Sequence, residues 1–367
     1  MKILSQSMVA ALFLMASMAA QAFSGQLDNF FTVDEYLGSH TGQPAVLERF
    51  RKRVRRPVGH SLNLKGLSVV IIYPGKQISD YWQRSARSFK KRLGEYGPGF
   101  KTHDYFMKPT ASLRFQAKVL KDALAEKPDY IIFTLDAQRH QRMIEPVLAK
   151  GKPKFILQNI TTPLKQWEGR QPMIYIGFDH IIGSRMVAAY FLKITRGQGT
   201  YAALLPRSGY LNTVRGGSFL DYMHQETSLE FIGSYHTGIN EKKAYQATLE
   251  ILNTHDKVSF IYAASTDIAL GAARAVAEKQ LTGKTLVNGW GGGSAELEAL
   301  AAEKIDVTVM RMNDDNGVAM ADAIALDFSG RGDEVPRIYS GDFSLVTKET
   351  PPGKVAELKK KAFRYSD

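Results

Sequence analysis

Polar and aromatic side chains gather near the ends of short apolar runs along this sequence. Those with binding chemistry are Gln77, Ser79, Trp82, Asn159, Arg215, Thr266, Asp267, Trp290 and Arg311. Amides and hydroxyls exchange hydrogen bonds with ligand oxygens, and an indole ring can cover an apolar face of a ligand. Guanidinium groups add permanently charged, forked donors. The set suits the binding of a small hydroxylated molecule in a cleft.

The two arginines give the sharpest chemical prediction. Arg311 directly follows the apolar run 307–310, where a fully solvated charge is unusual, and Arg215 lies in TVRGG, where a helix is expected to begin. Each residue could instead form an ordinary salt bridge. Meeting at one cleft from opposite lobes, they would favour an anionic ligand, because burying an unpaired charge is costly.

Patterns typical of enzymes and metal sites are missing from the sequence. It contains no cysteine, its eight histidines form no H-E-x-x-H pair, and no nucleophile elbow occurs. The glycines at 289–293 lack the lysine of a phosphate loop, and we expect them to let the backbone approach a ligand. We therefore expect no enzyme, no catalytic residue and no metal. Hydrolysis of a sugar would need two of Asp136, Asp179 and Asp267 to face each other.

Beyond Gly66, short β-branched or aromatic runs alternate with longer helical patterns. Strands are predicted at 68–73, 130–134, 154–157, 173–176, 201–205, 231–234, 258–263, 285–287 and 307–310. Continuous apolarity and helical crossovers predict parallel sheets buried on both faces. Because one doubly wound sheet would not hold so many strands, we expect two α/β lobes that bind ligand at the carboxyl ends of their strands.

The first 65 residues differ from the rest. Residues 1–22 combine Lys2, an apolar run from Met8 to Ala20 and the triplet AQA, which predicts a secretory signal peptide cleaved after Ala22. The run is too short to span a membrane, so we expect an exported mature chain with no membrane span and no nucleic-acid partner. Residues 23–65 are predicted to form an N-terminal arm with one helix at 43–54. Its basic run from Arg49 to Arg56, in a chain of net charge +12, indicates a solvated face or an acidic partner.

Several longer strings carry a family resemblance. YPGKQISDYW, IIFTLD, LQNITTP, GFDH, NGWGGGSAEL, VTVMRMNDD and KKKAFRYSD resemble the type I periplasmic binding proteins related to ribose-binding protein, and within them the LuxP-like receptors for autoinducer-2. The resemblance covers the chain after about Gly66. It implies a two-lobed α/β fold in which each lobe is a doubly wound, mostly parallel sheet with helices on both faces. The implied lobes are 66–178 plus 312–338 and 179–311 plus 339–367.

The resemblance also implies a function. In LuxP-like proteins, matches to the nine residues named above hold a furanosyl borate diester between the lobes, with Asp267 the weakest match. Borate would be part of the ligand, and no cofactor is implied. The implied partner is the periplasmic domain of a hybrid sensor histidine kinase that acts in quorum sensing. The basic run from Arg49 to Arg56 is not part of the family pattern. A periplasmic receptor for a neutral pentose or hexose, which feeds an ABC importer, remains the alternative.

Overall fold

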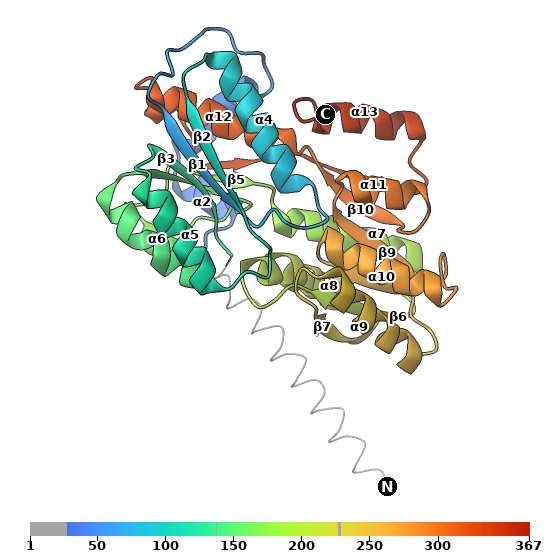
Figure 1. The fold of residues 1–367 in the computed structure, drawn as a ribbon. Coiled ribbons are helices and arrows are strands. Elements are labelled where there is room, and N and C mark those ends of the chain that lie inside the picture. Colours follow the sequence, from blue (N-terminus) through green and yellow to red (C-terminus); the bar gives the residue numbers. More distant parts are fainter. Residues whose placement is uncertain (1–27, 137, 227–228) are drawn as a thin grey trace.

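The computed structural model describes residues 28–136, 138–226 and 229–367. The predicted signal peptide at 1–22 lies outside these residues, as does the beginning of the predicted arm. The described chain forms two lobes, each built around a six-stranded sheet with helices packed against it (Figure 1). This is the predicted two-lobed α/β fold. None of the described helices is both long and apolar enough to cross a membrane.

The first lobe contains a parallel sheet with strand order β11-β5-β4-β3-β1-β2. Its strands are β1 (Ser68–Tyr73), β2 (Lys101–Phe106), β3 (Tyr130–Thr134), β4 (Lys154–Gln158), β5 (Ile174–Gly177) and β11 (Ile338–Ser340). Its helices are α4 (Tyr81–Tyr96), α5 (Leu113–Ala125), α6 (Gln138–Lys150) and α12 (Asp314–Phe328). Helices α2 (Val33–Ser39) and α3 (Gln43–Val54) precede the sheet, and the second is the helix predicted in the arm.

The second lobe repeats this plan with strand order β12-β10-β9-β8-β6-β7, in which only β12 runs antiparallel to its neighbour. Its strands are β6 (Thr200–Leu205), β7 (Glu230–His236), β8 (Phe260–Ala263), β9 (Leu286–Gly291), β10 (Val307–Arg311) and β12 (Phe343–Thr347). Its helices are α7 (His180–Thr195), α8 (Ser218–Glu226), α9 (Glu241–Thr254), α10 (Thr266–Glu278), α11 (Ser294–Ala301) and α13 (Pro352–Ala362).

The chain crosses between the lobes three times, after β5, after β10 and after β11. Strand β11 pairs with β5 through Ser340, so the last crossing lies two residues beyond the predicted boundary at 338. All three connections are short, with only Phe178 and Asp179 between β5 and α7. Short crossings of this kind allow the lobes to move as bodies about one hinge.

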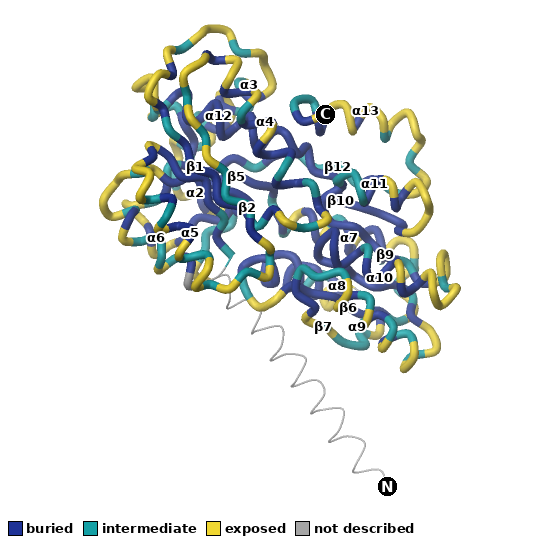
Figure 2. The backbone as a smooth tube through the Cα atoms, in the orientation of Figure 1, coloured by how far each residue is buried: buried dark blue, intermediate teal, exposed yellow. Residues whose placement is uncertain are grey.

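Burial on both faces explains why the central strands could be predicted. Along β1, Val69 and Ile71 join one apolar cluster while Val70 and Ile72 join another on the opposite face of the sheet. Figure 2 shows the sheets as buried traces, with exposure concentrated on helices and loops. Nine predicted strands are present. The strands that the sequence pattern missed, β2, β11 and β12, all lie at sheet edges, where one side is open and a continuous apolar run is not required.

A buried ion pair fixes the first lobe internally. Arg92 on α4 donates to Asp322 on α12 through Nε and Nη2 at 2.8 and 3.1 Å, and the Tyr96 hydroxyl donates to the same carboxylate at 2.8 Å. The side chain of Arg92 is 1% exposed and that of Asp322 is fully buried. Such a pair is costly to break because the remaining charge stays buried without a partner.

We therefore expect Asp322→Ala to lower the free energy of unfolding by about 3–5 kcal/mol. Urea denaturation followed by circular dichroism measures this loss. Asp322→Asn should cost less, because an amide oxygen can still accept from Arg92. Asp333→Ala, at an exposed position shortly after α12, serves as the control. A loss below about 1 kcal/mol for Asp322→Ala, the size typical of a surface pair, would contradict this account.

Candidate ligand-binding site

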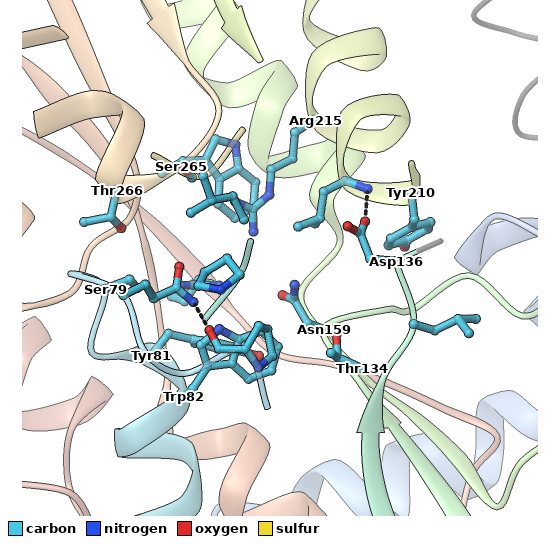
Figure 3. A pocket seen from close by; sticks show the side chains of 18 of the residues that line it. Ser79, Tyr81, Trp82, Thr134, Asp136, Asn159, Tyr210, Arg215, Ser265 and Thr266 are labelled. Carbon is cyan, nitrogen blue, oxygen red and sulfur yellow. Dashed lines mark hydrogen bonds between the residues drawn. The ribbon is translucent and has the colours of Figure 1, made fainter. Parts of the chain in front are cut away.

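A cavity lies between the lobes, at the carboxyl ends of the central strands (Figure 3). It encloses about 780 Å³ of space, part of it open to solvent. Its lining residues are Pro74, Gln77, Ser79, Tyr81, Trp82, Pro109, Gln116, Thr134, Leu135, Asp136, His140, Asn159, Tyr210, Leu211, Arg215, Ile239, Ser265, Thr266, Trp290 and Arg311. Eight of the nine predicted site residues are among them, and Asp267 is the exception.

Arg215 lies in a π-helical turn, Asn212–Gly217, that leads into α8. Only 4% of the residue is exposed. Its Nη1 donates to the carbonyl of Ala264 at 2.9 Å, and its guanidinium carbon lies 3.7 Å from the centre of the Trp290 ring. Its Nε is 3.3 Å from Nδ1 of His180. No carboxylate among the described residues forms an ion pair with it, so the predicted alternative of a salt bridge is wrong for Arg215.

Arg311 is the last residue of β10 and is also 4% exposed. Its guanidinium carbon lies 3.9 Å from the centre of the Tyr81 ring, which belongs to the first lobe. Its buried Nε has no hydrogen-bond partner within the described part of the chain. The aromatic faces stabilise both guanidinium groups in part, but neither charge is neutralised.

Burial lowers the pKa of both arginines, and the charge of Arg311 contributes to lowering the pKa of Arg215 to about 9. Because a guanidinium group is not deprotonated in proteins, both side chains nevertheless remain positive at neutral pH. Burial, together with the charge of Arg215, also lowers the pKa of His180, so this imidazole stays neutral. Burial raises the pKa of Asp136, although the charge of Arg215 opposes that shift. The cavity is thus an electropositive site with one carboxylate in its lining.

The prediction that the two arginines approach from opposite lobes is wrong. Arg311 pairs with Phe343 of β12 inside the second sheet, and Arg215 belongs to the same lobe. The second lobe therefore supplies both charged donors. The first lobe supplies the other lining residues that were predicted: Gln77 and Ser79 from the loop after β1, Trp82 from the first turn of α4 and Asn159 from the loop after β4.

Two buried oxygens at the cavity lack partners within the described chain: Oδ1 of Asn159 and Oγ of Ser265. Asn159 adopts a left-handed conformation with φ of 66°, which an asparagine tolerates better than most residues and which sets the direction of its amide. Buried polar atoms normally have partners. These two atoms are therefore available to hydrogen-bond a ligand.

Trp290 and Trp82 both line the cavity, but neither offers a free hydrogen-bond donor together with an open ring face to a ligand. The indole N–H of Trp290 donates to Ser184 at 3.2 Å and is therefore occupied, so Trp290 offers its face to Arg215 rather than a donor to a ligand. Trp82 packs with its ring centre 4.8 Å from Tyr73 and 4.7 Å from Tyr81. It is thus a largely buried wall of the cavity.

The glycine string after β9 makes room for this protein's own side chains. A Cβ at Gly291 would lie 2.7 Å from Nη2 of Arg311, and one at Gly292 would lie 2.4 Å from the Cα of Met310. Both glycines have positive φ. The string therefore lets the end of β10 and Arg311 approach the backbone, whereas the sequence suggested the approach of a ligand.

Asp267 does not line the cavity but an adjoining groove, which shares Gln77, Pro109 and Ile239 with it. Its carboxylate accepts from the backbone N–H groups of Ile78 and Ser79, at 3.2 and 3.4 Å. Asp179 accepts from Ile181 and Ile182 and caps α7. Of the three carboxylates considered for sugar hydrolysis, only Asp136 lines the cavity. The pair that such a mechanism requires is not assembled among the described residues.

Sequence reasoning missed several lining residues. Tyr81 and Ser265 adjoin predicted residues, so position alone could have indicated them. Asp136 was named only as a candidate for sugar hydrolysis, although it follows a predicted strand. Gln116 lies on α5 and Ile239 precedes α9, away from the ends of the central strands. No local signal marks these two, because they reach the cavity only through the packing of the lobes.

Residues 69–330, more than half of the chain, match the family described as periplasmic binding protein domain. The chain belongs to this family. Solved structures of similar fold include GanP, a glucose-galactose binding protein from Geobacillus stearothermophilus. GanP is 20% identical in sequence to this chain, and the two superpose with a TM-score of 0.69 over 78% of this chain and all of GanP.

Two other solved members of this fold are informative. An ABC transporter solute binding protein from Bacillus halodurans with bound myo-inositol is 17% identical, with a TM-score of 0.68 over 82% of this chain and 99% of that one. The XylFII–LytSN complex contains a chain that is 16% identical, with a TM-score of 0.66 over 78% and 99%. At these identities the likeness establishes the fold of a periplasmic binding protein and leaves the ligand open.

Because Arg311 carries a buried charge without a partner, we expect Arg311→Met to leave the free energy of unfolding of the ligand-free protein unchanged or to raise it by about 1–2 kcal/mol. Chemical denaturation after refolding from denaturant, which removes bound small molecules, measures the change. Arg92→Met is the matched control, since its charge is paired, and it should destabilise strongly. A loss above about 2 kcal/mol for Arg311→Met would show that the charge has a stabilising partner.

Proposed function

We propose that this protein is a receptor for a small polyhydroxylated anion, and that the furanosyl borate diester form of autoinducer-2 is its ligand. The observation that carries the proposal is the pair of buried arginines, Arg215 and Arg311, which face one cavity and form no ion pair with a carboxylate in the part of the chain that the structure describes. Burying an unpaired charge costs folding free energy, so a protein that keeps such a charge typically uses it in binding or catalysis.

The positive charge of the cavity lining suits a small anion. The two arginines outnumber Asp136, a carboxyl of the lining whose pKa is raised by burial, so the lining is positive whether or not Asp136 is ionised. A tetracoordinate borate carries one negative charge spread over oxygens that guanidinium N–H groups can reach as acceptors. Asn159 and Ser265 offer oxygens to the hydroxyls of the sugar-like ring, while Trp82 and Tyr81 form apolar walls.

Signalling would follow from closure of the lobes around this ligand. A ligand shifts an equilibrium between open and closed lobes only if it binds one of them more tightly. The proposed partner is the periplasmic domain of a hybrid sensor histidine kinase, after export with cleavage at Ala22. The XylFII–LytSN complex supports the capacity of this fold to dock a second protein.

The second candidate is a receptor for a neutral pentose or hexose that serves an ABC importer, and the comparisons favour it. The ligands named for two of the similar structures are neutral: glucose and galactose for GanP, and myo-inositol for the Bacillus protein. Asp136 lies in the same cavity as the arginines, and mixed donors and acceptors can serve neutral hydroxyls equally well. The two candidates therefore differ in whether the ligand carries charge.

Analysis of the small molecule released on denaturation separates the candidates. Boron and an autoinducer-2 fragment in the released material support the first candidate, and a neutral monosaccharide supports the second. Titration calorimetry of refolded protein with autoinducer-2, with and without borate, and with D-ribose and D-galactose gives an independent comparison. Tight binding of D-ribose or D-galactose with no effect of borate would reject the first candidate.

For the anion, Arg215→Ala and Arg311→Ala should each weaken binding by about 2–5 kcal/mol, because each removes a buried charge that pairs only with the ligand. Calorimetric titration with autoinducer-2 and borate measures both losses. Arg87→Ala, at an exposed position on α4, is the control and should bind as the wild type does. Wild-type affinity in both cavity variants would remove the electrostatic basis of the proposal.

The groove beside the cavity is lined by Lys76, Lys108 and Lys242, which outnumber its two carboxylates, Glu241 and Asp267. These lysines should steer an anion, so the association rate constant should fall several-fold as ionic strength rises from about 0.01 to about 1 M, where the screening length shrinks from about 30 to 3 Å. Stopped-flow fluorescence measures the rate. Replacing all three with glutamine should flatten the salt dependence, whereas an unchanged slope would contradict steering by this groove.

A further inference from the structure

Three carboxylates connect the lobes around the rim of the cavity. Asp80 and Asp136 project from the first lobe and Asp267 from the second, and each accepts hydrogen bonds from backbone N–H groups of the opposite lobe. Two of the contacts involve the loop between β1 and α4, which carries Ile78, Ser79 and Asp80, and the third involves Asp136 after β3. They are made by protein atoms alone and so do not require a particular ligand.

Asp267 holds the loop that covers the cavity from the first lobe. Both of its oxygens are used, one by the N–H of Ile78 and one by the N–H of Ser79. Ser79 lines the cavity, as does Thr266, which immediately precedes Asp267. In Figure 3 these two lining residues, Ser79 and Thr266, lie near each other, one from each lobe. A ligand that contacts both side chains would therefore bring the two halves of this contact together.

Asp136 makes the corresponding contact at another margin of the cavity. Its Oδ1 accepts from the N–H of Leu211 at 3.1 Å, and its carbonyl accepts from the N–H of Tyr210 at 2.9 Å (Figure 3). The Tyr210 hydroxyl accepts from Thr162 of the first lobe at 2.9 Å. The preceding Gly209 approaches so closely that a Cβ there would lie 2.8 Å from the Asp136 carbonyl oxygen.

Asp80 forms the third contact, where α4 meets α11. Its Oδ2 accepts from the hydroxyl of Ser294 at 2.8 Å and from the N–H of the same residue at 3.3 Å. Arg84 holds this carboxylate from its own lobe at 2.6 Å and also donates to the Ser294 hydroxyl at 3.0 Å. The hydrogen bonds from Arg84 and Ser294 lower the pKa of Asp80 against the opposing effect of burial, so it is charged at neutral pH.

We propose that Asp80, Asp136 and Asp267 are positioning residues that latch the lobes in the closed state, and that they populate this state before a ligand binds. Hydrogen bonds to a charged acceptor contribute more than neutral ones. The bonds to Asp80 have a charged acceptor, and together with the bonds to Asp136 and Asp267 they stabilise closure without the ligand being a partner in any of them. The proposal does not depend on whether the ligand is the borate diester or a neutral sugar.

Gly293 offers a way to weaken closure without removing a latch residue. A Cβ at this position would lie 2.3 Å from Oδ1 of Asp80, across the gap between the lobes. Its φ of −73° and ψ of 178° are allowed for alanine. In Gly293→Ala the conflict therefore arises only when the lobes are closed. Gly353→Ala, on α13, is the matched control, because nothing lies within 4 Å of its added Cβ.

Because the chain has no cysteine, two introduced cysteines can carry spin labels for pulsed electron-electron resonance. Lys121→Cys on α5 and Glu250→Cys on α9 place labels at exposed positions on different lobes. The distance distribution of refolded, ligand-free protein then reports the ratio of closed to open lobes. We expect a closed population in the wild type, and a roughly tenfold fall in the closed-to-open ratio in Asp267→Ala.

Asp267→Asn should give an intermediate ratio, because its amide oxygen still accepts one N–H, and Gly293→Ala should lower the ratio while Gly353→Ala leaves it unchanged. Circular dichroism and thermal unfolding identify any variant that fails to fold, and the Asn and Gly293→Ala variants then carry the test. A ligand-free wild type with only open lobes overturns the proposal. An unchanged ratio in Asp267→Ala and Gly293→Ala overturns it as well. Neither result bears on the identity of the ligand.

Discussion

Two guanidinium groups buried at one cavity, neither of them in an ion pair with a carboxylate of the described residues, are the constraint on which the site depends. Arg215 lies on the face of Trp290 and Arg311 on the face of Tyr81, so aromatic rings take the place of counter-ions. A ring attracts a cation without cancelling its charge, and the positive potential remains directed at the cavity. A buried charge in this state favours any guest that supplies negatively polarised oxygen.

The fold divides the work of the site between its lobes. The second lobe carries both arginines, held by β10 and by the π-helical turn before α8. The first lobe carries neutral hydrogen-bonding groups, the carboxyl of Asp136 and the aromatic walls of the cavity, at or just after the ends of strands buried on both faces. The ion pair of Arg92 with Asp322 keeps α4 and α12 of the first lobe together, so opening can proceed at the three crossings rather than inside a lobe.

The sequence predicted those features that a local pattern expresses. Strands buried on both faces appear as continuous apolar runs, and the residues that follow them line the cavity, as Gln77, Asn159 and Thr266 do. Edge strands such as β2 lack that signal. Two further features could not be predicted from the sequence, because they depend on how distant segments pack. One is the contribution of Gln116 on α5 to the cavity lining, and the other is the position of both arginines in a single lobe.

That shared position changes how charge and closure are coupled. Because both arginines belong to one lobe, their mutual repulsion does not itself push the lobes apart. Closure does remove water from them, and that desolvation opposes the closed state. The rim carboxylates offset this cost through contacts that exist with any ligand or none. An anion offsets it directly, because it neutralises the charge at the moment water leaves, and so it gains affinity specifically in the closed state. A neutral ligand lacks this gain and must depend more on the rim contacts and on its own hydrogen bonds.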